Sequence, residues 1–90
     1  MKLRRTTTQT NFYGKSTSIE SYCLAISFTR PSTGTSGVQI NGIPLAAGQT
    51  LSISQSQDDI DNSRYEIRFD DTGLNELWVI RVLPLDAIDL

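Results

Sequence analysis

The chain has 90 residues, 38% of them hydrophobic, which suffices for one small domain with a modest core. Eight Lys and Arg residues stand against ten Asp and Glu residues, and this net charge of −2 argues against a nucleic-acid partner. The absence of His excludes a His-based catalytic triad and a His-ligated metal site within one chain. No run approaches the ~20 apolar residues of a membrane span, so we expect no membrane partner.

Residues 1–17 are predicted to form an extended polar and basic arm outside the domain. The first 11 of them are mostly Thr, Gln, Asn and cationic residues, which are too polar to pack within a small core. Such an arm either frays or is added as a strand to the sheet edge of a neighbour. We expect five of its side chains to contact a neighbouring subunit: Leu3, Arg4, Arg5, Phe12 and Tyr13.

A β domain is predicted over residues 18–83, and its first strand covers residues 18–29. In that stretch Tyr22, Leu24, Ile26 and Phe28 share one parity, as in a strand with one buried face. Cys23 lies on the opposite, small-residue face with no cation beside it in the sequence, so we expect a buried, unreactive thiol.

The next predicted feature is a hairpin over residues 38–45. Asn41-Gly42 separates two apolar runs there, and a type I′ turn needs the positive φ that these two residues tolerate. Pro44 lacks a backbone donor, so the return strand is expected at a sheet edge.

Three later segments complete the predicted domain. Residues 50–55 and 65–69 alternate as strands, while residues 77–83 are apolar except for Arg81, which is typical of a central strand buried on both faces. We therefore expect Trp78 in the core. About six short strands separated by turns predict an all-β antiparallel sandwich or small barrel with minimal helix.

Residues 84–90 are predicted to form a connector tail. Its large apolar side chains should cover a surface of this chain or of a neighbour, so they join the expected interface: Leu85, Ile88 and Leu90.

Enzyme chemistry is not expected. Asp71-Thr72-Gly73 resembles the Asp-Thr-Gly of aspartic proteases, which share one proton between two such aspartates. Only 17 residues follow Gly73, however, too few for the flap and substrate walls of that family, and a turn explains the three residues fully. No cofactor is predicted.

Two weaker ligand hypotheses remain open. Asp58, Asp59 and Asp61 could offer oxygens to Ca²⁺, although their spacing fits a solvated acidic loop better. Exposed aromatic side chains could form a sugar-stacking platform, and the candidates are Tyr13, Tyr22, Tyr65 and Trp78.

Residues 38–45 and 48–53, followed by residues 60–61, 65–69 and 77–81, resemble a stretch of small β-rich virion proteins of tailed bacteriophages. The resemblance covers residues 38–81. It implies a structural part of a virion, such as a head auxiliary, decoration or fibre-base protein, assembled in the host cytoplasm. The partners would be other copies of the chain and other structural proteins. The alternative hypothesis is a glycan-binding or adhesin-type β module.

Overall fold

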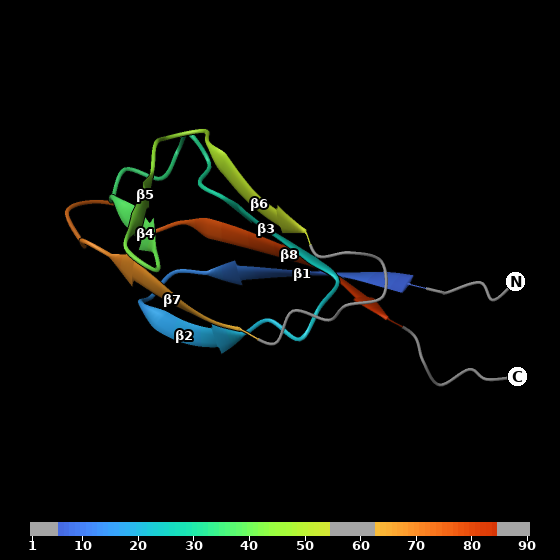
Figure 1. The fold of residues 1–90 in the computed structure, drawn as a ribbon. Coiled ribbons are helices and arrows are strands. Elements are labelled where there is room, and N and C mark those ends of the chain that lie inside the picture. The colour runs from blue at the N-terminus through green and yellow to red at the C-terminus, as the bar shows by residue number, and fades with distance from the viewer. Residues whose placement is uncertain (1–5, 55–62, 85–90) are drawn as a thin grey trace, which may run out of the picture.

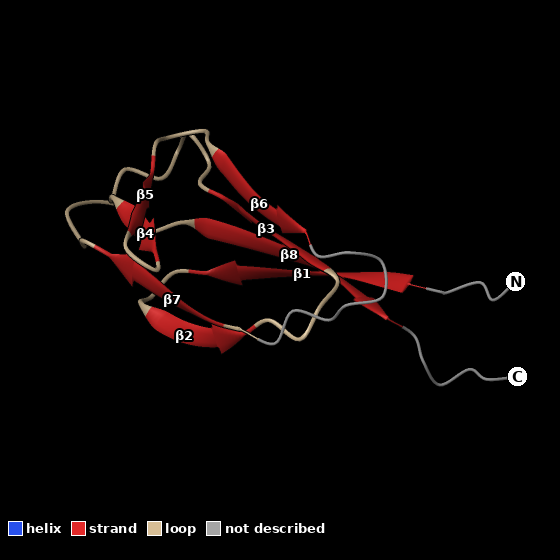
Figure 2. Ribbon diagram, viewed as in Figure 1, coloured by secondary structure: helices blue, strands red, loops and turns tan. Residues whose placement is uncertain are grey.

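The computed structural model describes residues 6–54 and 63–84, and in these ranges the chain is all-β with no helix (Figures 1 and 2). This part of the chain contains eight strands, which form two four-stranded sheets in which every paired neighbour is antiparallel. The predicted all-β sandwich is confirmed, with eight strands in the described residues in place of about six.

Each sheet combines strands that are far apart in the sequence. Sheet A has the order β1 (Thr6–Tyr13), β8 (Leu77–Pro84), β3 (Ala25–Thr29) and β6 (Thr50–Ser54). Sheet B has the order β2 (Thr17–Glu20), β7 (Arg64–Phe69), β4 (Val38–Ile40) and β5 (Ile43–Leu45).

The core lies between the two sheets and takes alternate residues of β3, β4, β7 and the first half of β8. In β7 the burial alternates strictly, and Tyr65 reaches across to Phe28 of β3 with ring centroids 5.2 Å apart. Cys23 is fully buried in this core, as predicted, and the low reactivity of its thiol stays a prediction. The other buried apolar members are Ile26, Val38, Ile40, Leu45, Ile67, Phe69, Leu77 and Val79. Full burial stabilises such side chains by roughly 1.5–3 kcal/mol each.

The single strand predicted over residues 18–29 is wrong, because the chain changes sheets in its middle. β2 belongs to sheet B and β3 to sheet A, and Tyr22 between them has a φ of 37° and is 55% exposed. Backbone hydrogen bonds hold both sides of the crossing, from Ser21 N to Ser63 O at 3.0 Å and from Leu24 N to Val82 O at 2.8 Å. Alternation on either side of the break had made the two strands look like one.

The predicted arm over residues 1–17 is wrong for the residues that the structure describes. Residues 6–13 form β1, which pairs with β8 along its whole length, from Thr6 opposite Pro84 to Tyr13 opposite Leu77. Polarity did not exclude these residues from the domain, since an edge strand with one solvated face accommodates Thr well. The other predicted contacts of the two ends lie outside the described residues: Leu3, Arg4, Arg5, Leu85, Ile88 and Leu90.

β8 is a central strand, as predicted, but only one of its faces is buried. Leu77 and Val79 are inaccessible, whereas Trp78 is 42% and Ile80 37% exposed. Trp78 is therefore not in the core. An apolar run indicates a strand covered on both sides in parallel sheets, but each sheet of this sandwich has only one covered face.

The Asn41-Gly42 hairpin is confirmed. The two residues have φ values of 53° and 84° and join β4 to β5, with Ile40 paired to Ile43. Asn41 Oδ1 also accepts a hydrogen bond of 2.8 Å from Glu66 N, which ties the turn to β7. β5 is an edge strand of sheet B, as its Pro44 predicted.

Candidate functional site

The strongest candidate site is the outer face of sheet A. Residues in register on neighbouring strands point to the same side of a sheet. The pairings place Phe12, Trp78, Thr29 and Thr50 in one row and Thr10, Ile80, Ser27 and Ser52 in the next. We call the following described residues the outer face of sheet A: Thr6, Thr8, Thr10, Phe12, Ala25, Ser27, Thr29, Thr50, Ser52, Trp78, Ile80 and Val82. None of them carries a charge.

An apolar stripe runs through this face along β8. Phe12 and Trp78 are 49% and 42% exposed and pack edge to face, with ring centroids 4.9 Å apart and an interplanar angle of 60°. Ile80 follows Trp78 on the same side of the strand, and half-buried Val82 follows Ile80. Exposed large apolar groups that adjoin one another are the usual mark of a contact surface.

Hydroxyl groups border the stripe on both sides. On β3 and β6, Ser27 Oγ lies 3.2 Å from Ser52 Oγ and Thr29 Oγ1 lies 3.0 Å from Thr50 Oγ1. A hydroxyl has one donor and two acceptor positions, so these pairs keep hydrogen-bonding capacity for a partner. The outer face of sheet A thus combines apolar contact with neutral hydrogen bonding.

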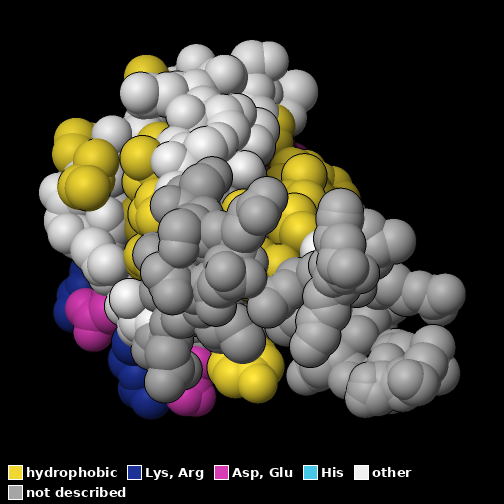
Figure 3. Space-filling model, turned by 45° about the vertical axis from the view of Figure 1, so that its right-hand side comes forward, with side chains coloured by type: hydrophobic (Ala, Val, Ile, Leu, Met, Phe, Trp, Pro, Cys, Tyr) yellow, Lys and Arg dark blue, Asp and Glu magenta, His cyan; other side chains and the backbone are white. Residues whose placement is uncertain are grey.

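The outer face of sheet B is different in kind. Its strand β7 alternates buried apolar residues with exposed charged ones, which are Arg64, Glu66 and Arg68. The Arg68–Glu66 pair, 3.8 Å apart, is widely exposed and contributes little stability. In Figure 3 the visible charged side chains gather at the lower left of the molecule, and the upper part is mostly uncharged.

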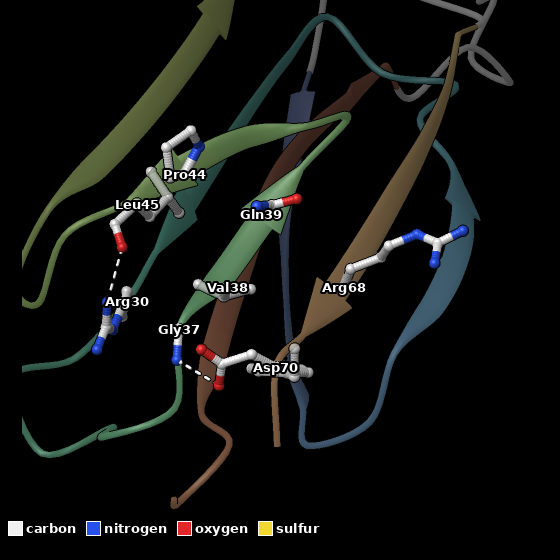
Figure 4. Close-up of a pocket in the computed structure, with 9 residues that line it drawn as sticks. Arg30, Gly37, Val38, Gln39, Pro44, Leu45, Arg68 and Asp70 are labelled. Carbon is white, nitrogen blue, oxygen red and sulfur yellow. Dashed lines mark hydrogen bonds between the residues drawn. The ribbon is translucent and has the colours of Figure 1, made fainter. Parts of the chain in front are cut away.

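A hollow of about 410 Å³ lies at the end of sheet B where β4, β5 and β7 meet (Figure 4). Arg30 and Asp70 are among the residues that line it, but both act on the backbone. Arg30 donates to Leu45 O at 2.8 Å and to Gly34 O at 3.2 Å, and Asp70 accepts a bond of 2.9 Å from Gly37 N. Both side chains therefore hold the loops around the hollow in place.

Asp70 also begins the turn that contains Asp71-Thr72-Gly73. The hydroxyl and the backbone N–H of Thr72 donate to Asp70, and with the Gly37 N–H they lower the pKa of this carboxyl. Asp71 has a φ of 58° and accepts a hydrogen bond of 2.8 Å from Asn75 Nδ2. Asp71, Thr72 and Gly73 lie in the turn between β7 and β8, as the sequence predicted.

No cluster of three or more His, Cys, Asp or Glu side chains able to hold a metal occurs in the described residues. The candidate Ca²⁺ ligands Asp58, Asp59 and Asp61 lie outside them. Within the same ranges, no helix is long and apolar enough to cross a membrane.

The structure separates the aromatic residues that the sequence grouped. Two residues of the predicted interface lie in the described part of the chain. Phe12 is on the outer face of sheet A, while Tyr13 is half-buried and packs against the core. The four-residue sugar platform is wrong as a set, because Tyr65 is buried and Tyr22 lies in the crossing between sheets. Trp78, expected in the core as part of the central strand and at the surface in the glycan alternative, is exposed. Strand register, which brings it opposite Phe12, is the signal that identifies it.

Comparisons of the chain with protein-family models, with curated proteins and with solved structures give no match.

Proposed function

We propose that the chain is a non-enzymatic structural protein of a larger assembly and binds a neighbouring protein subunit through the outer face of sheet A. The observation that carries this proposal is the adjacency of Phe12, Trp78 and Ile80, all exposed, on a face without charge.

The composition of this face suits a protein partner. Aromatic side chains supply much of the binding energy of interfaces, and covering the exposed parts of these three residues would contribute on the order of a few kcal/mol. No ion on the described face has to be desolvated when a partner covers it, so little of that gain is lost.

The kind of assembly is proposed from the resemblance of residues 38–81 to tailed-phage virion proteins. A head auxiliary, decoration or fibre-base protein of a virion is repeated many times, so weak contacts between copies add up. Thr6 pairs with Pro84, so β1 begins where β8 ends, at one end of sheet A (Figure 1). The terminal segments 1–5 and 84–90, proposed as further contacts, are joined to the domain at that end.

The glycan-binding alternative is favoured by one specific observation. The edge-to-face pair of Phe12 and Trp78 lies in the same row as the hydroxyls of Thr29 and Thr50. A neutral sugar could stack on the indole and bond to the hydroxyls.

Trp78 is the only tryptophan, so its fluorescence tests the proposal directly. With rising concentration of the chain, we expect emission at shorter wavelength and weaker quenching by acrylamide as a second copy covers the indole. Ile80→Thr should weaken this shielding, and Gln39→Thr on the outer face of sheet B should not. A Trp78 that is equally quenchable at all concentrations, yet responds to neutral oligosaccharides, would favour the glycan alternative.

A further inference from the structure

β1 is a long edge strand with one unpaired side. It has eight residues and is the outermost strand of sheet A, where its only neighbour among the described strands is β8. Its register with β8 runs through eight consecutive pairs without a bulge. Residues 6–13 contain no charge, Pro or Gly, and residues 6–10 are all exposed. These are the features that natural edge strands avoid when they must not pair with another chain.

The other three edges are less suited to pairing. β5 has three residues and contains Pro44, and β2 has four and ends in Glu20. β6 is uncharged like β1 but has five residues. An antiparallel ladder has about one hydrogen bond for each pair of opposite residues. Pairing along its whole length would therefore give β1 about eight hydrogen bonds to a new strand and β6 about five.

The absence of charge along β1 favours a second copy of the chain as the partner. A two-fold contact brings each residue opposite a residue of the same strand, so a charged edge repels its own copy and a neutral one does not. β1 is neutral throughout, and its outer-face side chains at its centre, Thr8 and Thr10, can hydrogen-bond to their counterparts. A charged peptide would find no complementary group along this strand.

We propose that β1 pairs antiparallel with β1 of a second copy about a two-fold axis, so that the two A sheets form one continuous sheet. This inference rests on the proposed function and names its first partner. The axis is perpendicular to the sheet, so the two outer faces become one surface, with both Phe12–Trp78 pairs on the same side. The joined surface would present twice the apolar contact to the next component.

The test is the solution mass of the full chain by light scattering on a sizing column, over a range of concentrations. Thr8→Lys with Thr10→Lys puts Lys opposite Lys in each register centred on residue 8, 9 or 10. We expect this variant to raise the dissociation constant of the dimer about tenfold or more at low salt, and less at high salt. Thr8→Val with Thr10→Val has the same branched shape without charge and should remain a dimer.

Thr17→Lys with Ser18→Lys on β2 adds the same two charges at an edge of sheet B, outside the proposed surface, and is the control. It should remain a dimer, and circular dichroism is used to check that each variant is folded. A wild-type chain that is monomeric at all concentrations would overturn the inference. So would loss of association in the β2 variant alone, or an open series of oligomers, which a contact between β1 and a different edge strand would produce.

The two proposals fail in different ways. If the double lysine variant of β1 still associates and Ile80→Thr does not, the edge inference is wrong and the outer face stands as the contact. If Trp78 stays quenchable in a wild-type dimer that the β1 lysines dissociate, the edge inference stands and the outer face is not the self-contact.

Discussion

Phe12 and Trp78 lie directly opposite each other on β1 and β8, and their rings pack edge to face with centroids 4.9 Å apart. The contact joins the edge strand to the centre of sheet A on its solvent side. It therefore stabilises β1 as well as forming part of the proposed binding surface.

The first prediction concerns the energy of this aromatic pair. A double-mutant cycle with Phe12→Ala and Trp78→Ala should give a coupling of about 0.5–1.5 kcal/mol in the free energy of unfolding, because such pairs contribute beyond the area they bury. Urea unfolding followed by circular dichroism measures it, since the cycle removes the only tryptophan. A cycle of Phe12→Ala with Ile43→Ala, on the exposed edge of sheet B, should show a coupling near zero. Equal couplings in the two cycles would contradict the prediction.

The sequence predicted those parts of the fold that local chemistry determines. Asn41-Gly42 forms its hairpin because few other residues tolerate two successive positive φ values. Strict alternation in β7 likewise indicated a strand with one buried face, and Tyr65 and Ile67 are indeed buried.

The parts that depend on strand pairing could not be predicted in the same way. Residues 6–13 read as an arm because nothing local shows that β8, some seventy residues later, pairs with them. Trp78 read as core because an apolar run does not say which of its faces a second sheet covers. Its role at the surface depends on register with Phe12, which is a long-range property.

The second prediction concerns Arg81, which fastens the crossing between the sheets. Its Nη1 donates to Glu20 O at 3.0 Å and Ser21 O at 3.1 Å, and its Nη2 donates to Gln9 Oε1. Arg81→Met keeps the stem and removes the donors. We expect a loss of about 1–3 kcal/mol in unfolding free energy, because the charged bonds are lost and Ser21 is buried.

Arg68→Met is the control for Arg81. Arg68 belongs to an exposed ion pair, so its loss should cost less than about 1 kcal/mol. Hydrogen exchange gives a second readout, since Arg81→Met should raise the rate for the Leu24 amide near the crossing. Equal effects of the two variants would show that Arg81 does not hold the crossing.

The third prediction concerns the pKa of Asp70. The Thr72 hydroxyl is the largest cause of its lowering, so Thr72→Val should raise the pKa of Asp70 towards its ordinary value. An NMR titration of the carboxyl measures this. Thr33→Val removes a comparable hydroxyl, which bonds to Glu76 instead, and should leave the titration of Asp70 unchanged.

The sign of the accompanying pH dependence follows from the same shift. A carboxyl with a lowered pKa in the folded state stabilises the fold above its unfolded pKa, about 3.8, and this contribution is lost as the pH falls through the folded value. Asp70→Asn should therefore lower stability at pH 7 and flatten its decline in acid. An unchanged acid limb in this variant would contradict the assignment.

The last prediction concerns Gly73, which follows Thr72 in the turn between β7 and β8. A Cβ there would collide with the side-chain oxygen of Thr35 and lie 3.0 Å from Thr35 Cβ and 3.2 Å from its carbonyl carbon. That oxygen already accepts a hydrogen bond of 2.7 Å from Leu74 N, and Gly73 N donates to Ser36 Oγ at 2.8 Å. The two loops therefore cannot separate without losing bonds. Gly73→Ala should cost about 1–3 kcal/mol in unfolding free energy.

Two further variants test whether this close approach is the cause. Gly14→Ala adds a Cβ at ordinary contact distances of 3.6 and 3.7 Å, so its effect should stay within about 0.5 kcal/mol. Thr35→Ala removes the colliding oxygen, and combined with Gly73→Ala it should destabilise less than the sum of the two single changes. Additive effects, measured by urea unfolding, would mean that Gly73 is required for some reason other than its contact with Thr35.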